Sequence, residues 1–239
     1  MIVLFTDFGW QGPYVGQMKA VLNSRVPNVP VIDLMHDVPA FDPVAASHLL
    51  AAFAPQFPVD TIFIAVIDPD VGDPARRPYM VQADGRWFVG PDNGLFNMIE
   101  ARGLDVQRYE ILWQPEKMSN SFHGRDLFAP VAAMLSQWDM PEHQLLGANT
   151  LSVNHDLYQV IYLDDYGNAI TGIRGDALFK EQLLRVGDIT LNFAKTFSQV
   201  EEGEAFWYVN SSDLVEIAVN KGSAKEALSL DIGSVINVS

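Results

Sequence analysis

The stretch TIFIAVIDPDVG, residues 61–72, is a continuous apolar run that leads directly into an aspartate-containing turn. Runs of this kind are typical of strands in a parallel sheet that is buried on both faces. A second apolar run, residues 2–5, leads into Thr6-Asp7-Phe8-Gly9. Because ligands of open α/β sheets bind outside the carboxyl ends of the strands, Asp7 and Asp68 indicate a site for a polar or cationic small molecule. The alternative is that each aspartate caps the turn or helix that follows it.

Strand-like and helix-like segments alternate over residues 1–148 and predict an α/β domain with a mainly parallel, doubly wound sheet. Asp42-Pro43 has the form of an N-cap followed by proline at the first helical position, and Asp84-Gly85 is a hairpin turn signal. Pro130 is a weak point inside the longest helical pattern. The expected strands are 2–5, 29–34, 61–67, 79–83 and 87–89, and the expected helices are 14–22, 44–53, 94–101 and 124–138.

The pattern changes after about residue 150, and residues 156–239 predict a smaller all-β, barrel-like domain. Short strands separated by turns are expected at 158–163, 169–173, 189–193, 205–209, 215–219 and 235–238. Residues 223–228 are the exception, because Ser223 and Glu226 form a capping-box pattern that predicts a helix.

The composition excludes several classes of function. The formal net charge of −15 would repel nucleic acid, so we expect no nucleic-acid partner. The chain has no cysteine, which excludes disulfides, thiolate catalysis and cysteine-ligated zinc. No apolar run has the ~18 residues that span a bilayer, and none has signal-peptide form. We therefore expect a cytoplasmic protein without a membrane partner.

Generic catalytic signatures are missing, which disfavours NAD enzymes, NTPases and serine hydrolases. Three polar segments remain, and they carry Asp68, the pair Arg76-Arg77, and His123. Together such groups could activate water, because a guanidinium stabilises hydroxide and an imidazole can accept the proton. The alternative is that the arginines are solvated loop charges and that His123 is a hydrogen-bonded residue at a helix start. No His/Asp/Glu spacing predicts a metal site.

Eight short motifs occur in one order along nearly the whole chain, and this order resembles the S-adenosylmethionine hydroxide adenosyltransferase family, which is related to fluorinases and chlorinases. The motifs are Thr6-Asp7-Phe8-Gly9, Pro13-Tyr14-Val15-Gly16-Gln17-Met18-Lys19, His36-Asp37-Val38-Pro39, Asp68-Pro69-x-Val71-Gly72, Pro91-Asp92-Asn93-Gly94, Phe122-His123-Gly124-Arg125-Asp126, Tyr166-Gly167-Asn168 and Glu216-Ile217-Ala218-Val219-Asn220-x-Gly222-x-Ala224.

The resemblance implies a fold, an assembly and a reaction. The fold is an α/β domain followed by a β-barrel-like domain. The assembly is a homotrimer with each active site between the first domain of one subunit and the second domain of its neighbour. The reaction is S-adenosylmethionine plus water giving adenosine and methionine, without a cofactor. Because the leaving group is a neutral thioether, no general acid is needed to protonate it.

The resemblance also implies roles for particular residues. The family's catalytic set matches Asp68, Arg76 and His123. The positions that match substrate contacts are Asp7 at the ribose hydroxyls, Phe41 near the ribose, Asp164, Tyr166 and Asn168 around the nucleoside and the methionine part, and Ser211 near the methionine carboxylate.

Three departures from the family pattern bear on the site. Asp70 stands where the family has glycine, which adds a negative charge beside Asp68. The segment before the arginines is one residue longer than usual, so Arg77 could take the role of Arg76. Gly12 replaces an aspartate that contacts the substrate's amino group, which weakens the expected recognition of the methionine end.

Two other functions compete with hydrolysis. A halogenase would share the fold, but halogenases place serine where this chain has Gly124, and they lack the Asp-Arg-His set. A nucleoside-binding or sensor protein would keep the pocket without the chemistry, and Asp70 and Gly12 are compatible with that alternative.

Overall fold

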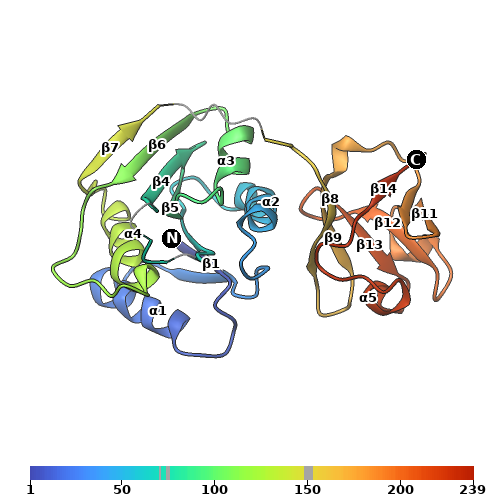
Figure 1. The fold of residues 1–239 in the computed structure, drawn as a ribbon, viewed down its shortest axis with the longest axis horizontal. Helices are drawn as coiled ribbons and strands as arrows, with labels where there is room; N and C mark the ends of the chain where they lie inside the picture. Colours follow the sequence, from blue (N-terminus) through green and yellow to red (C-terminus); the bar gives the residue numbers. More distant parts are fainter. Residues whose placement is uncertain (70, 74–75, 148–152) are drawn as a thin grey trace. The chain divides into compact units, whose positions relative to one another are not determined.

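A mixed β-sheet forms the centre of the first of two units into which the chain divides, Met1–Val153 and Asn154–Ser239 (Figure 1). The computed structural model describes residues 1–69, 71–73, 76–147 and 153–239. The first unit contains β1 (Ile2–Thr6), α1 (Tyr14–Arg25), β2 (Val31–Met35), α2 (Pro43–Phe53), η1 (Ala54–Gln56), β3 (Ile62–Val66), β4 (Pro78–Ala83), β5 (Arg86–Pro91), α3 (Asn97–Arg102), β6 (Val106–Ile111), η2 (Gly124–Phe128), α4 (Ala129–Leu135) and β7 (His143–Leu146).

The first sheet is half parallel and half antiparallel, so the prediction of a mainly parallel sheet was wrong. Within the described residues the strand order is β2-β1-β3-β5-β4-β6-β7. β1 pairs in parallel with β2 and β3, and β3 pairs in parallel with β5. The Asp84-Gly85 hairpin then reverses the chain, and β4, β6 and β7 extend the sheet by antiparallel pairing. The parallel half brings the carboxyl ends of β1 and β3 together.

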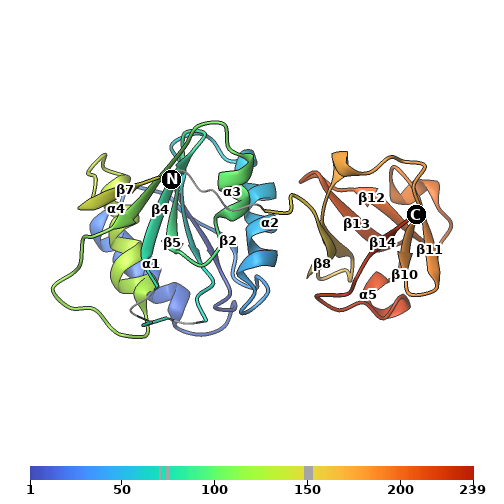
Figure 2. The same ribbon diagram turned by 45° about the horizontal axis from the view of Figure 1, so that its top comes forward.

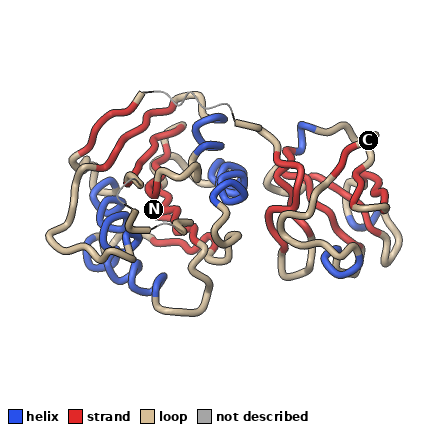
Figure 3. The backbone as a smooth tube through the Cα atoms, viewed as in Figure 1, coloured by secondary structure: helices blue, strands red, loops and turns tan. Residues whose placement is uncertain are grey.

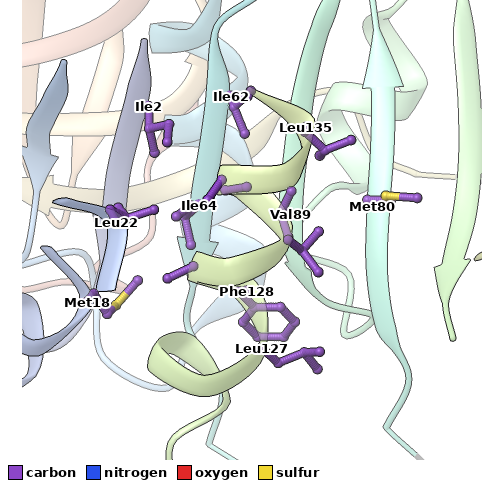
Figure 4. Close-up of a cluster of buried hydrophobic side chains, with 14 of the residues drawn as sticks. Ile2, Met18, Leu22, Ile62, Ile64, Met80, Val89, Leu127, Phe128 and Leu135 are labelled. Atoms are coloured by element: carbon purple, nitrogen blue, oxygen red, sulfur yellow. The ribbon is translucent and has the colours of Figure 1, made fainter. Parts of the chain in front are cut away.

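Helices cover both faces of this sheet. Figure 2 shows α1 and α4 on one side and α2 and α3 on the other, as in a doubly wound arrangement. The core under α1 and α4 is fully apolar, and Figure 4 shows how the helices and strands meet in it. Among the buried side chains labelled there are Met18, Leu22, Ile64, Met80 and Phe128. Burial of each such side chain stabilises the folded state by roughly 1.5–3 kcal/mol. The packed core therefore holds in place the strand ends that carry the candidate site.

The long helix expected over 124–138 is divided in two. Its first part, η2, is a π-helical turn, and α4 follows it directly. Pro130 lies where the π-helical turn passes into α4, which is the point at which the helical hydrogen-bond pattern changes. π-helical turns are frequent at functional sites, and this one begins immediately after His123.

The second unit is a β structure whose strands curl toward closure (Figure 3). Its elements are β8 (Leu157–Leu163), β9 (Ala169–Arg174), η3 (Gly175–Ala177), β10 (Leu184–Val186), β11 (Ile189–Phe193), η4 (Phe197–Gln199), β12 (Ala205–Val209), β13 (Leu214–Val219), α5 (Ala224–Ala227) and β14 (Asn237–Val238). The strand order is β14-β10-β11-β12-β13-β9-β8 in the described part of the chain. A bridge between Gln159 and Val235 links the β8 edge to the segment before β14, so the sheet is nearly barrel-like, as expected.

The capping box predicted at the start of α5 is confirmed on one side. The Ser223 hydroxyl accepts the amide of Glu226 at 3.2 Å. Among the described residues, no helix has the length and apolarity to cross a bilayer.

Candidate active site

Asp68 and Arg76 form an ion pair just beyond the carboxyl end of β3. Arg76 Nη1 donates to Asp68 Oδ1 at 3.0 Å, and the side chains are 18% and 4% exposed, respectively. Arg77 pairs with a different acid, because its Nη1 is 3.3 Å from Glu110 Oε2, and its side chain is 57% exposed although it borders the same cavity as Arg76. The sequence left Arg76 and Arg77 as alternatives, and Arg76 is the one that faces Asp68.

His123 lies next to this pair. A cavity of about 150 Å³ is lined by Asp68 and His123 together with aromatic side chains. A second cavity, of about 420 Å³, is lined by Arg76 and His123. His123 therefore borders both cavities, and the three side chains of the predicted catalytic set are brought together by β3, the loop after it and the start of η2.

The loop that carries His123 is fixed by Asp126. Asp126 Oδ2 accepts the amide of Ser119 at 2.8 Å, and Arg125 Nε donates to Asp126 Oδ1 at 2.6 Å. The hydrogen bond from Arg125 holds the pKa of Asp126 below its usual range, helped by the Ser119 amide and by the positive charge of Arg125. A carboxylate anchored in this way restricts the position of His123.

Three aromatic rings form the apolar wall of the smaller cavity, and none of them was predicted as a site residue. The ring centroids of Phe8, Tyr14 and Phe122 are 5.3 to 5.9 Å apart in tilted and edge-to-face geometry. Such packing leaves ring faces and edges directed at the enclosed space. The available signal was their position inside three of the quoted motifs.

Asp7 lies close to the same strand end. Its amide donates to the Val66 carbonyl at 3.4 Å, and its Oδ2 accepts the amide of Phe41 at 3.4 Å. Burial raises the pKa of Asp7, although the Phe41 amide acts in the opposite direction. Phe41 has a φ of 63°, and its side chain is 74% exposed. A bulky residue in the left-handed region is strained and clusters at functional positions.

Asp164, Tyr166 and Asn168 share one turn between β8 and β9 of the second unit. Asp164 Oδ1 accepts the amides of Tyr166 and Asn168, at 2.9 and 2.8 Å, and its Oδ2 accepts Asn168 Nδ2 at 2.9 Å. The three side chains line a cavity of about 590 Å³. Ser211 lies in the turn after β12 and is outside the described lining of this cavity.

Glu216 is a buried carboxylate in the same cavity that the sequence did not single out as a site residue. It lies on β13, is 5% exposed, and accepts hydrogen bonds from the Tyr208 hydroxyl and from Asn210 Nδ2. Burial raises the pKa of Glu216 against the effect of those hydrogen bonds, and the charge of Asp164 adds to the rise. The signal that could have found it is a single acid in an otherwise apolar strand.

The remaining departures from the family pattern can be placed in part. Asp70 lies outside the described residues. Gly12 has a φ of 118°, and a Cβ built there would meet nothing within 4 Å. The loop thus leaves space where the family has an aspartate. Among the described residues, no group of three His, Asp or Glu side chains is placed to hold a metal ion.

Comparison with known proteins identifies the family. The N-terminal domain of SAM hydroxide adenosyltransferases matches residues 2–144, and the C-terminal domain matches residues 158–237. A relative from Thermus thermophilus named (R)-S-adenosyl-L-methionine hydrolase is 36% identical, over 99% of this chain and 98% of its own. A relative of the same name from Salinispora arenicola is 33% identical, over 98% of this chain and 95% of its own.

A solved structure of similar fold is that of an uncharacterized conserved protein from Thermotoga maritima. It aligns with a TM-score of 0.88 and 31% identity, over 100% of this chain and 99% of its own. Both family domains match in order and at nearly full length, and His123 borders the cavity of Asp68 as well as the cavity of its ion-pair partner Arg76. This chain therefore belongs to the SAM hydroxide adenosyltransferase family.

Proposed function

We propose that this protein hydrolyses S-adenosyl-L-methionine by attack of water at C5′, giving adenosine and L-methionine. The observation that carries the proposal is the partly buried Asp68–Arg76 pair, with His123 at the cavities of both residues, in a chain of this family. The two relatives that bear the name (R)-S-adenosyl-L-methionine hydrolase align over nearly their whole length, which supports the same activity here.

The proposed chemistry needs a positioned and activated water. Its oxygen forms a bond to C5′ while the C5′–S bond breaks, and the bonding electron pair leaves with the sulfur as a neutral thioether. Arg76 stabilises the negative charge that develops on the attacking oxygen, and His123 accepts the proton. Asp68 holds the Arg76 guanidinium in place at 3.0 Å. Positioning of the two reactants supplies the rest of the acceleration.

Residues of the first unit and of the second unit are both proposed to bind the substrate. Asp7 would bind the ribose hydroxyls, with Phe41 beside the ribose. The cavity of Asp164, Tyr166 and Asn168, with Ser211 nearby, would take the nucleoside and methionine parts. We propose that this second unit comes from a neighbouring subunit of a homotrimer in the cytoplasm. The support is the family resemblance and the small size of the cavity at Asp68, about 150 Å³, which cannot enclose the whole substrate.

The space around Gly124 favours water over halide as the nucleophile. A Cβ on Gly124 would lie 3.3 Å from Met18 Sδ and 3.5 Å from the Phe8 ring. The contact with Met18 is tight and the contact with Phe8 is ordinary, so a side chain there requires Met18 to shift by a few tenths of an ångström. The serine of the halogenases would therefore crowd this cavity, whereas glycine leaves it open.

The test is hydrolysis in water enriched in oxygen-18, with adenosine followed by chromatography and mass spectrometry. We expect adenosine that carries the heavy isotope on its 5′ oxygen, and unlabelled methionine. The reaction is repeated with chloride and with fluoride to detect a 5′-halo product.

Each other outcome rejects the proposal in its own way. Tight binding of the substrate without adenosine release would identify a binding or sensor protein. A 5′-halo nucleoside that depends on halide would identify a halogenase. Adenosine release that survives Asp68→Asn unchanged would reject the residue assignment while leaving the reaction intact.

A further inference from the structure

A chain of hydrogen bonds, buried at its Thr6 and His36 end, leads to the segment that carries Asp7. Lys19 Nζ on α1 is 2.9 Å from Asp33 Oδ2, Asp33 Oδ1 is 3.1 Å from His36 Nε2, and His36 Nδ1 is 2.8 Å from Thr6 Oγ1. Thr6 Oγ1 in turn accepts the amide of Phe8 at 3.3 Å. This relay, defined as Lys19–Asp33–His36–Thr6, is formed by residues of α1, β1, β2 and the segment after β2.

The buried end of the relay, Thr6 and His36, cannot contact substrate directly. Thr6 and His36 are 0% exposed, and the ring of Trp10 packs edge-on against His36 with centroids 4.9 Å apart. A threonine, histidine and aspartate in line resemble a nucleophile, a base and its orienting acid. A buried hydroxyl reaches no substrate, so the arrangement has a different use.

The directions of the hydrogen bonds follow from the partners. A carboxylate only accepts, so His36 donates Nε2–H to Asp33. In the neutral ring, which we assign to His36 as part of the proposal, Nδ1 carries no proton and accepts the Thr6 O–H. The oxygen of Thr6 remains free to accept the Phe8 N–H. Burial raises the pKa of Asp33, but the hydrogen bonds from Lys19 and His36 outweigh it, and the pKa is held below its usual range. Each member thereby fixes the orientation of the next.

The last hydrogen bond of the relay joins the two residues that flank Asp7. Thr6 precedes Asp7, and Phe8, whose amide it holds, follows it. The same two segments are joined by backbone bonds, because Gly9 N–H donates to the His36 carbonyl and Val38 N–H donates to the Thr6 carbonyl at 3.3 Å. Phe8 is also a wall of the cavity that contains Asp68 and His123. An altered Thr6 hydroxyl would therefore move Asp7 and Phe8 together.

We propose that Asp33 and His36, acting through the Thr6 hydroxyl, are positioning residues that hold Asp7 for the ribose and Phe8 against the reacting end of the substrate. The inference rests on the proposed function for what Asp7 binds. It goes beyond that function by assigning a role to three residues remote from the chemistry.

The first test compares Thr6→Val with Thr6→Ser. Valine keeps the shape of threonine but removes the hydroxyl, whereas serine keeps the hydroxyl. Leaving the Phe8 amide and His36 Nδ1 without partners weakens the ribose site, so we expect Thr6→Val to raise the KM for S-adenosylmethionine about tenfold. The kcat should fall by a smaller factor than the KM rises, because the displaced Phe8 borders the reacting end of the substrate while Asp68, Arg76 and His123 are themselves unchanged. Thr6→Ser should restore the wild-type KM.

The second test does not depend on catalysis. Nitrogen-15 NMR of labelled histidine should show His36 with its proton on Nε2, identified by the loss of its signals in His36→Gln. The Phe8 amide should exchange with solvent at least about tenfold faster in Thr6→Val than in Thr6→Ser. The affinity for adenosine, measured by calorimetry, should fall in parallel.

The outcomes separate the two proposals. A wild-type protein that releases no adenosine but shows the tautomer and the exchange difference rejects the proposed function and keeps the relay. A wild-type protein that is active, with equal KM and equal Phe8 exchange in both Thr6 variants, rejects the relay. A proton on Nδ1 of His36 also rejects it.

Discussion

Asp68 and Arg76 are joined at 3.0 Å at the carboxyl end of β3, and the neighbouring Arg77 turns to Glu110. The pair is largely withdrawn from solvent, with Asp68 only 4% exposed. Surface ion pairs contribute little to stability, and buried pairs are costly to desolvate. A buried pair beside a histidine and a cavity is therefore better explained by function than by stability.

Replacement of either arginine by glutamine gives a matched pair of variants. Arg76→Gln removes the charge that we propose stabilises the attacking oxygen, so kcat should fall about 100-fold or more. Arg77→Gln removes an exposed charge, so kcat should stay within about threefold. Steady-state adenosine release measures both. Equal losses in the two variants would contradict the assignment of Arg76.

His123 is expected to act as the proton acceptor. His123→Asn should lower kcat by about 100-fold or more, with little effect on the affinity for adenosine, because general bases contribute roughly 10²–10⁴-fold. His155→Asn is the control, since this exposed histidine lies in the second unit. A His123→Asn enzyme with the wild-type pH–rate profile and rate would exclude the imidazole from the reaction.

Much of the parallel half of the fold was predictable, and the antiparallel half was not. The apolar runs at β1 and β3 signal buried strands by composition alone. The sequence VQRYEI of β6 and the exposed HQLL of β7 carry no such signal. β6 forms because it pairs with the free edge of β4 in the β4–β5 hairpin, and β7 then pairs with β6. Pairing of this kind depends on tertiary contacts and not on local composition.

The candidate site shows the same limit. Motifs pointed to Asp68, Arg76 and His123, but they could not decide between Arg76 and Arg77, because the segment before the arginines is one residue longer than is usual in the family. The relay was also hidden, since Asp33 falls within a predicted strand and His36 in a turn. Only the tertiary structure places Asp33 and Thr6 on the two ring nitrogens of His36.

The Asp7 carboxylate is expected to lower the stability of the folded protein at neutral pH while it strengthens substrate binding. Its raised pKa means that the carboxylate disfavours the folded state, so the contribution of Asp7 to stability is complete below pH 3.8 and is lost as the pH rises through the raised pKa. At pH 7, Asp7→Asn should therefore raise Tm slightly, by no more than about 3 °C because the group is partly solvated. This advantage should disappear in acid.

The same Asp7→Asn variant should bind adenosine about 10- to 100-fold more weakly, because hydrogen bonds from ribose hydroxyls to a charged acceptor are lost. Calorimetry measures the affinity, and thermal melts at several pH values measure the stability. Asp139→Asn, at an exposed position after α4, is the control and should change neither property. A drop in Tm together with unchanged affinity would show that Asp7 has a structural role only.

Gly90 on β5 is expected to be essential for the sheet that carries the site. A Cβ on Gly90 would lie 2.1 Å from the carbonyl oxygen of Ala65 and 3.1 Å from the ring of Phe96. The first contact is with the backbone of β3, which cannot move away without opening the β3–β5 pairing. Ala65 precedes Asp68 by only three residues, so such a movement would reach the candidate site. Gly90→Ala should cost about 3 kcal/mol or more, measured by urea denaturation.

Gly16→Ala is the matched control for Gly90→Ala. Gly16 lies inside α1, and a Cβ there would meet nothing within 4 Å. Because alanine in a helix loses less backbone freedom on folding than glycine, the change should stabilise the protein by about 0.5–1 kcal/mol. A Gly90→Ala protein as stable as Gly16→Ala would mean that β3 and β5 can separate at Ala65 without loss of the sheet, and the rigidity that we attribute to the strand end before Asp68 would then have another source.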